Sequence, residues 1–296
     1  MSEQPNDWKQ TGKKVSNWGR WGANDEKGTL NLIAPKHIRQ AATLIQAGKV
    51  YSLSVPLEAD GPQWPSRHDT WVTTKVSPRG EGKGVSDDII TMHSHSGTHI
   101  DSLCHVWYDH QLYNGYEAAE HLTPDGSTRN AIHNVPAIVG RGVLLDVAGW
   151  KGVASLQLGE PISATDLDHC AASQNVTIQS GDIVLVNTGW INTFDADREQ
   201  FYAGEPGLDM STPEWLRAHN ISAIGADNHA VEVIETMPPD NLPFHQVAIR
   251  DMGLYLLEYL DLRQLAAAKA YEFFFVAAPL QLTNAVGSPI NPLAIV

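Results

Sequence analysis

Four of the thirteen histidines in this chain lie within thirteen residues, 93–105, which read His-Ser-His-Ser-Gly-Thr-His-Ile-Asp-Ser-Leu-Cys-His. Each of these histidines, and Asp101, occupies an odd-numbered position. Side chains alternate between the two faces of a β-strand, so an extended backbone would point all five the same way. Such a polar face makes a poor core but a suitable pocket for zinc, manganese or iron.

A helical conformation of this stretch fits the residues less well. His95 and His99 would share a helix face at i and i+4, as in the His-Glu-x-x-His zinc signature. Gly97 and Thr98, which lie between them, are weak helix formers, and Asp101 would point away from the pair. A further alternative is a polar cluster, or histidines on a loop, without any metal.

We predict that His95, His99 and Asp101 bind the metal. Two imidazoles and one carboxylate leave coordination positions open for water, as catalytic sites do. Water bound to such a cation loses a proton near neutral pH and becomes a nucleophile. His105 lies further along the same predicted face, where it could transfer a proton to the leaving group. Cys104 has the opposite parity and is expected to pack in the interior.

Two other functional classes remain open at this stage. Two histidines and one carboxylate also form the facial triad of non-haem iron oxygenases, for which His99 and Asp101 would need a distant third ligand such as His229 or His245. Iron dependence and oxygen consumption would distinguish that class. The other class is a metal-binding protein without catalysis, whose ligand set would be closed. The sequence contains no Gly-x-Ser-x-Gly elbow of a serine hydrolase.

Composition limits the partners of the chain. Its 296 residues carry a formal net charge of −14, which argues against nucleic acid or an anionic membrane surface and leaves small molecules and divalent metals. No apolar run approaches the roughly 18 residues of a membrane span, and the N-terminus lacks the pattern of a signal peptide. Two distant cysteines make no disulfide framework. We therefore expect a cytoplasmic location.

Helix and strand patterns alternate without a linker, which predicts one α/β or α+β domain over residues 1–296. We expect irregular structure at 1–34, an N-terminal extension whose tryptophans dock onto the body of the protein or line a neighbouring subunit's pocket. We expect irregular structure also at 228–244 and a Pro/Gly-punctuated tail at 280–296. Strands are predicted at 50–57, 142–147, 182–187, 221–226 and 271–277. Helices are predicted at 35–48, 164–174 and 212–219, and a helix or helix-and-turn within 250–270, which contains Glu258.

The predicted substrate pocket is aromatic. Residues 58–88 are rich in Gly and Pro, carry Trp64 and Trp71, and lead directly into the histidine stretch, so we predict a loop that serves as a lid or pocket wall. Trp107 and Tyr108 follow the stretch and would offer a wall for a planar or apolar substrate. The alternatives are a mobile surface loop and plain core packing.

Residues 95–105 resemble the His-x-Gly-Thr-His-x-Asp-x-Pro-x-His signature of the cyclase family, which includes bacterial kynurenine formamidase and isatin hydrolase. Supporting matches are Thr188-Gly189-Trp190, Pro243-Phe244-His245 with the run 253–262, and the run 275–280. The resemblance implies a swivelling β/β/α fold with a central barrel-like sheet flanked by helices, and a homodimer or homotetramer. It also implies hydrolysis of a cyclic or aryl amide with Mn²⁺ or Zn²⁺; a lactone or ester is the alternative substrate of the same site.

The same resemblance implies roles for individual residues. By motif position, His95, His99 and Asp101 would be metal ligands and His105 the catalytic histidine. His245 and Glu258 would complete a second metal site, with Asp101 bridging. Leu103 replaces the proline of the motif, and the chain is longer than a formamidase, so we expect a longer relative that acts on a lactam, lactone or other amide.

Overall fold

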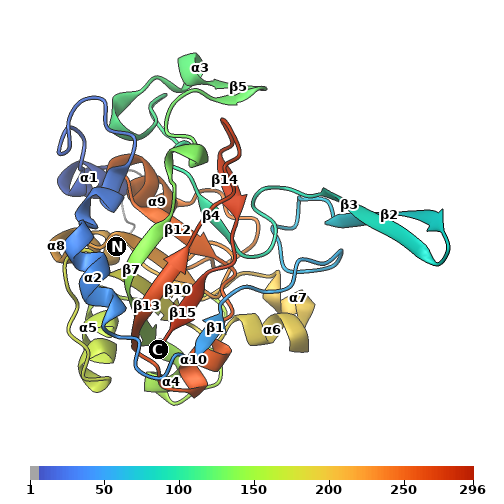
Figure 1. Ribbon diagram of the computed structural model, residues 1–296. Coiled ribbons are helices and arrows are strands. Elements are labelled where there is room, and N and C mark those ends of the chain that lie inside the picture. The colour runs from blue at the N-terminus through green and yellow to red at the C-terminus, as the bar shows by residue number, and fades with distance from the viewer. Residues whose placement is uncertain (1–6) are drawn as a thin grey trace.

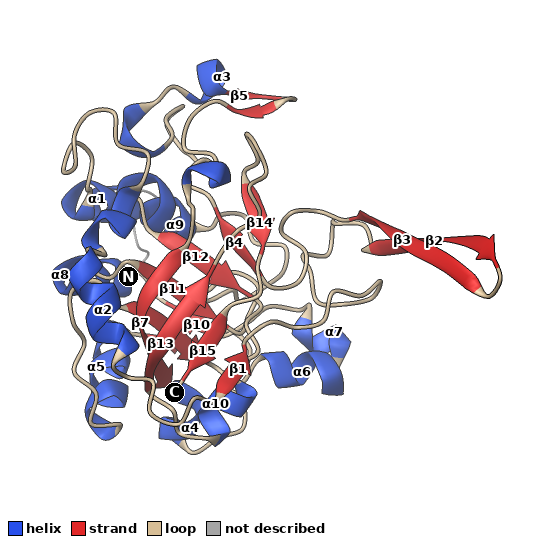
Figure 2. Cartoon of the chain, in the orientation of Figure 1, coloured by secondary structure: helices blue, strands red, loops and turns tan. Residues whose placement is uncertain are grey.

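A nine-stranded sheet organises the fold of residues 7–296, the part of the chain that the computed structural model describes (Figures 1 and 2). Its centre is parallel and consists of β7 (Ile138–Asp146), β9 (Ile183–Asn187), β11 (Ala223–Ala226) and β12 (Tyr255–Glu258). Antiparallel strands extend it on both sides: β4 (His99–Asp101) and β14 (Gly287–Pro289) beyond β12, and β13 (Glu272–Ala277), β15 (Leu293–Ile295) and β1 (Val50–Ser52) beyond β7.

Three two-stranded ribbons stand outside this sheet: β2 (Trp71–Gly80) with β3 (Lys83–Thr91), β5 (Leu122–Thr123) with β6 (Gly126–Ser127), and β8 (Pro161–Ile162) with β10 (Gly207–Leu208). The α-helices are α1 (Asp7–Val15), α2 (Pro35–Ala42), α3 (Ala118–His121), α4 (Val147–Lys151), α5 (Ala164–Ser173), α6 (Ile191–Ala196), α7 (Arg198–Phe201), α8 (Thr212–His219), α9 (Pro243–His245) and α10 (Arg263–Ala267). A π-helical segment, Gln246–Asp251, continues α9. Within residues 7–296, none of the helices combines the length and hydropathy needed to cross a membrane.

The mixed α/β fold with a curled central sheet and flanking helices is confirmed (Figure 1). The central strand β9, Ile-Val-Leu-Val-Asn, is buried along its whole length, as expected for a parallel strand covered on both faces. The predicted helix at 164–174 is also confirmed as α5. Its N-terminus is a capping box, in which the Ser163 hydroxyl accepts from Asp166 N–H and the Asp166 carboxylate accepts from Ser163 N–H.

Three predicted elements differ in kind. Residues 58–88 are not an irregular loop throughout, because Val, Thr and Ile at 71–91 favour extended structure and pair as β2 and β3. Glu258 ends strand β12 instead of lying in a helix, because Tyr-Leu-Leu before it is buried between β11 and β4. The tail at 280–296 supplies two strands, β14 and β15, to the sheet.

Other boundaries shift in response to tertiary contacts. The predicted helix at 35–48 ends at Ala42, and the predicted strand at 50–57 pairs only over Val50–Ser52 before a single bridge joins Ser54 to Leu260. Residues 1–34 include helix α1; residues 1–6 of this extension lie outside the described part.

The N-terminal segment is docked by its tryptophans, as one of the two alternatives predicted. The Trp18 indole N–H donates to the backbone oxygen of Arg250 at 2.7 Å, and the Arg250 guanidinium lies 4.3 Å from the Trp18 ring centroid. The Trp8 ring meets Tyr108 edge-to-face, with 4.9 Å between centroids. The Trp18 contacts tie the segment after α1 to the π-helical segment, and the Trp8 contact ties α1 to the segment that follows the histidine stretch.

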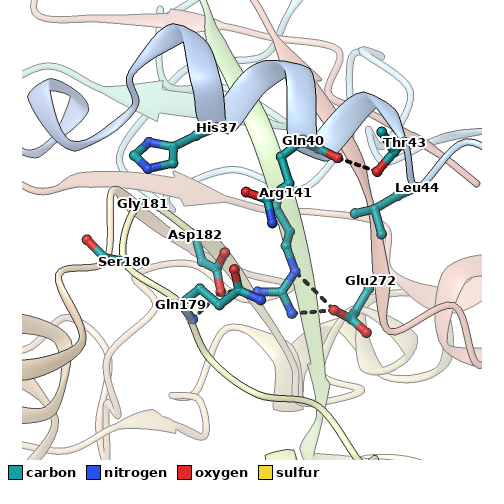
Figure 3. A pocket seen from close by; sticks show the side chains of 11 residues that line it. His37, Gln40, Thr43, Leu44, Arg141, Gln179, Ser180, Gly181, Asp182 and Glu272 are labelled. Carbon is teal, nitrogen blue, oxygen red and sulfur yellow. Dashed lines mark hydrogen bonds and ion pairs between the residues drawn. The ribbon is translucent and has the colours of Figure 1, made fainter.

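A buried ion pair joins β7 to the turn before β9 (Figure 3). Arg141 on β7 donates to the Asp182 carboxylate at 2.6 Å and also pairs with Glu272 at the start of β13. The Asp182 side chain is only 3% exposed, and this burial raises its pKa despite the opposing effect of Arg141. A small cavity of about 150 Å³ lies between these residues and α2. The Arg141 guanidinium lines it, and its charge is neutralised by Asp182 and Glu272.

Removing this guanidinium tests how far the sheet depends on it. Arg141→Met is expected to lower the free energy of unfolding by about 3–5 kcal/mol, because it leaves the buried Asp182 carboxylate without a cation. Arg141 lowers the pKa of Asp182, so its removal should raise that pKa further above the value in the unfolded chain. The folded variant then holds a proton that the unfolded chain releases, and the loss of stability should grow as pH rises. Urea unfolding in mildly acidic and mildly alkaline buffer measures both effects. The double variant Arg141→Met/Asp182→Asn should recover most of the loss; no recovery would contradict the explanation.

Candidate metal centre

Six titratable side chains from β4, the turns on either side of it, β12 and α9 converge at one place. Strand β4 contributes His99 and Asp101, and the turns on either side of it contribute His95 and His105. Glu258 is the last residue of β12, and His245 is the last residue of α9. Five of the six side chains are at most 7% exposed, and only His105, at 24%, opens toward solvent.

Asp101 is the centre of the cluster. Its Oδ1 atom lies 3.3 Å from His95 Nε2, 3.5 Å from His99 Nε2 and 4.0 Å from His105 Nε2. Its other oxygen, Oδ2, lies 3.5 Å from His245 Nε2. One carboxylate therefore faces four imidazoles: three lie near Oδ1 and the fourth lies near Oδ2.

Glu258 is the second carboxylate and closes one side. Its Oε2 atom is 3.0 Å from His99 Nε2, and its Oε1 atom is 2.9 Å from His245 Nε2. Strand pairing produces this arrangement, since Glu258 lies opposite His99 in the antiparallel register between β12 and β4.

Three of the histidines are held by their other ring nitrogen. Nδ1 of His99 lies 2.8 Å from the backbone oxygen of Gly97, Nδ1 of His95 lies 3.0 Å from the Ser94 hydroxyl, and Nδ1 of His245 lies 3.0 Å from Oε1 of Glu232. A carbonyl or carboxylate partner fixes the proton on Nδ1 and leaves the Nε2 lone pair free. In each ring it is Nε2 that faces Asp101 or Glu258.

The atoms that face the centre fit a cation. Among the described residues, Nε2 of His95, Nε2 of His99 and both carboxylate oxygens of Asp101 are buried without a hydrogen-bond partner. Leaving buried polar groups unpaired costs free energy, about 1–3 kcal/mol each and more when they are charged. A divalent cation would satisfy all four at once, and imidazole and carboxylate are ligands that zinc and manganese accept.

Two groups of three residues have ligand atoms within 4.8 Å of one another: His95, Asp101 and His105, and His99, Asp101 and Glu258. Asp101 belongs to both, so the donor set has room for two ions with this carboxylate between them. His105 lies close enough to be a ligand in the first group, whereas the sequence motif implies a catalytic role for it.

The charges of the cluster are strongly coupled. Burial alone would raise the pKa of Asp101, but the surrounding imidazoles hold it well below its usual range. Burial alone would lower the pKa of His99, yet the carboxylates of Asp101 and Glu258 raise it to about 9. The buried carboxylates are stabilised by nearby positive charge, which a protonated imidazole supplies when no metal is bound. Binding of a cation should therefore release protons.

A glycine turn and a side-chain hydroxyl hold β4 in this position. Gly97, at φ 58°, turns the chain immediately before β4, where a Cβ would lie 2.7 Å from Leu57. The Thr98 hydroxyl donates to the backbone oxygen of Tyr259 at 2.6 Å and accepts from Val55 N–H, which fixes β4 against the end of β12. On the other side, a Cβ on Gly287 would lie 2.3 Å from His95 Nε2, so the glycine makes room for that ring.

The structure brings together His95, His99, Asp101, His105, His245 and Glu258, but not through the single extended strand predicted for 93–105. Only His99–Asp101 is a strand, because Gly97 turns the chain before it and a second turn follows Ser102. His93 lies outside the cluster, with its ring 4.2 Å from that of His68. His229, one possible third ligand of an iron triad, uses both ring nitrogens on Tyr259 and Phe201, so that assignment is wrong.

The four aromatic residues predicted for the substrate pocket have different surroundings. Trp64 lines a cavity of about 400 Å³ together with Arg67 and Tyr202. Trp71 is 52% exposed at the base of the β2–β3 hairpin, and Trp107 is 46% exposed. Tyr108 donates to Asp251 at 2.6 Å and packs against the N-terminal helix, which gives it a structural role. Contact of any of these four residues with substrate stays a prediction.

Two residues outside the motif, neither of them predicted from the sequence, also support the cluster. The Glu232 carboxylate accepts hydrogen bonds from His245 Nδ1–H, His245 N–H and Phe244 N–H. Arg67, in the segment before β2, donates to the backbone oxygen of His95. Neither carries a local signal, except that Glu232 is an acidic residue in the apolar run Ala-Val-Glu-Val-Ile. Cys104 is buried with its sulfur 3.0 Å from the Ser102 hydroxyl, consistent with packing.

Known proteins resemble this chain in sequence and in fold. A family model described as "Putative cyclase" matches residues 51–233. A solved structure described as a novel cyclase superposes with a TM-score of 0.90 at 36% identity and covers 96% of this chain and 99% of its own. Kynurenine formamidase from Bacillus cereus is 24% identical over 244 residues, which are 81% of this chain and 93% of the relative. Isatin hydrolase A from Labrenzia aggregata has a TM-score of 0.64 at 20% identity, covering 88% of this chain and 98% of its own.

Glu232 offers a test of the anchoring described above. Glu232→Gln is expected to weaken the binding of Zn²⁺ or Mn²⁺ by about 10–100-fold, because an amide nitrogen would replace one of the oxygens that orient His245. Titration calorimetry measures the affinity. Glu235→Gln, a change at an exposed glutamate nearby, is the matched control and should bind metal normally. Equal affinities in the two variants would show that Glu232 does not orient a ligand.

Proposed function

We propose that this chain, which belongs to the cyclase family of metal-dependent hydrolases, opens a carbon–nitrogen bond of a cyclic or aryl amide with the help of a divalent metal, Mn²⁺ or Zn²⁺. The observation that carries the proposal is the set of four unpartnered atoms on His95, His99 and Asp101 in a buried cluster. A structural ion pair would satisfy its own members, whereas these atoms point at a common space.

The donor set supports a catalytic centre over a structural one. It consists of imidazoles and carboxylates without a cysteine, and one member, His105, is open to solvent. A divalent cation bound here would supply a water ligand of lowered pKa and would polarise a substrate carbonyl. By motif position we assign His95, His99 and Asp101 to the first ion, and His245 and Glu258, with Asp101 shared, to a second. The distances place His99 beside Glu258 as well, so His99 can serve either ion.

His105 is the residue that we assign to proton transfer. Its ring stacks on that of His95, with 4.2 Å between centroids, and its side chain is the most exposed of the cluster. Burial lowers the pKa of His105, so the imidazole is neutral at neutral pH and can accept a proton at Nε2. It can then return that proton to the nitrogen that leaves when the amide bond breaks.

The class of substrate follows from the relatives. Kynurenine formamidases are among the curated relatives that this chain matches over most of their length, and isatin hydrolases share the fold. These names support hydrolysis of an amide bond that is not a peptide bond. The relation is distant, so the particular amide has to be found by assay.

Metal removal and restoration test the proposed function directly. Chelation is expected to abolish hydrolysis of a panel of cyclic amides, formanilides and lactones, and added Zn²⁺ or Mn²⁺ should restore it. Asp101→Ala should lose metal affinity by more than about 100-fold and should not be restored, because Asp101 faces every imidazole of the cluster. Asp125→Ala, at an exposed aspartate, is the control. Activity that survives complete removal of metal would refute the proposal; restoration by iron alone, with oxygen consumed, would point to an oxygenase.

A second variant separates binding from proton transfer. His105→Ala is expected to retain the metal content of the wild type and to lose turnover by about 10²–10⁴-fold, the contribution typical of a positioned acid or base. Metal analysis and steady-state kinetics on the same sample measure the two effects. Joint loss of metal and activity would instead make His105 a ligand, which its distance to Asp101 permits, and would remove it from proton transfer.

A further inference from the structure

Arg67 carries a positive charge that no carboxylate of the described residues balances. Among residues 7–296 it forms no ion pair, and its guanidinium donates one hydrogen bond, to the backbone oxygen of His95. Arg198, which lines the same cavity, instead has the carboxylate of Asp60 at 3.1 Å. A guanidinium has five N–H donors, so most of those on the half-buried Arg67 side chain remain available to a ligand or to water.

The cavity that Arg67 lines has a volume of about 400 Å³ and lies between the segment before β2 and helix α7. This volume is within the roughly 300–1,000 Å³ of small-molecule sites. The rings of Trp64 and Tyr202 line it as well. In Figure 1, α7 lies on the side of the body from which the β2–β3 hairpin extends. Aromatic surface beside a guanidinium suits a planar ligand that carries a negative charge.

The cavity adjoins the candidate metal centre. The Ser96 hydroxyl donates to the side chain of Gln63, in the cavity wall, at 2.7 Å, and Arg67 donates to the backbone oxygen of His95. Burial is the main cause of the lowered pKa of His105, and the charge of Arg67 acts in the same direction. Since His105 is the member of the cluster that opens toward solvent, the guanidinium is within electrostatic range of the open side of the centre.

We propose that Arg67 binds a carboxylate on the substrate, and that the enzyme therefore acts on aryl amides that carry a carboxylate. This inference rests on the proposed function, because it names a substrate class for the same metal centre. The planar fork of an arginine matches the two oxygens of a carboxylate. The amide would lie at the metal centre beside His105, and the part of the substrate that carries the carboxylate would extend along Arg67 toward Trp64.

Two aspartates also line the cavity, but neither pairs with this guanidinium. Asp60 lies 3.1 Å from Arg198, so these two charges balance each other. Asp69 is exposed, where water and salt screen its repulsion of an anion. Arg67 is half-buried against His95, where its attraction for an anion is screened less. The positive charge that a ligand would meet in the cavity is therefore that of Arg67.

Two matched substrates test the proposal. The compounds para-formamidobenzoate and para-nitroformanilide share the ring and the amide, and a nitro group has the shape of a carboxylate but no net charge. On the metal-loaded full-length enzyme, Arg67→Met is expected to lower the ratio of kcat/KM for the benzoate to kcat/KM for the nitro compound by about 10–100-fold, the loss expected when a hydrogen-bonded charge pair is removed. The meta isomers are measured alongside, and the pair with the larger ratio in the wild type is compared between variants.

The ratio separates recognition of the carboxylate from support of the site. Arg67→Met can slow both substrates, because Arg67 also bonds to the backbone of His95, but such a loss cancels within one variant. Arg67→Lys keeps the charge without the planar fork and should give an intermediate ratio. Arg39→Met, at an exposed arginine outside the cavity, is the matched control and should keep the ratio of the wild type. An unchanged ratio in Arg67→Met, or an equal fall in Arg39→Met, would overturn the proposal.

Equilibrium binding gives a readout that needs no turnover. Titration calorimetry of the metal-loaded protein is expected to show tighter binding of para-formamidobenzoate than of para-nitroformanilide, and Arg67→Met should lose most of that difference. A carboxylate bound by the metal alone would leave the difference intact in Arg67→Met and would overturn the assignment, as would equal binding of the two compounds to the wild type. Hydrolysis of neither compound, together with binding that depends on Arg67, would count against the proposed function but would support the anion site.

Discussion

The negative charge of two buried carboxylates is the constraint on which the rest of the structure depends. Asp101 and Glu258 lie in the interior, where an ionised group is costly unless a cation balances it. Their neighbours are imidazoles, whose second nitrogens are anchored outward on Gly97, Ser94 and Glu232. Packing and hydrogen bonds thus fix the rings in place, while the atoms that face inward remain available to a metal.

Another buried carboxylate, Asp182, makes a useful contrast. Asp182 is paired with Arg141 at 2.6 Å, and the guanidinium also pairs with Glu272. There the protein supplies its own permanent cation and nothing more is needed. Around Asp101 the protein supplies only histidines, which can give up their protons to make room for another cation. A buried carboxylate is thus neutralised in one place by an arginine of the chain, and in the other by protons on histidines that a metal ion can replace.

Sheet topology converts distant segments into one site. Strand β4 has three residues, but it pairs with β12 on one side and β14 on the other, so Glu258 lies beside His99 and Gly287 beside Asp101. The bridges that Thr98 makes to Tyr259 and Val55 hold β4 at its start.

The sequence by itself determined the chemistry of the site and the class of the fold. The spacing of His95, His99 and Asp101 predicted a metal site, because so many imidazoles and carboxylates rarely lie close together for another reason. Apolar runs such as 182–187 predicted buried strands. Tertiary structure decided what depends on pairing between distant residues. It placed Glu258 in a strand, since β11 and β4 bury the residues before it, and it brought in Glu232, which has no local signal. It also made 71–91 a hairpin that its own chain leaves uncovered, because strand formation is local whereas burial requires a partner surface.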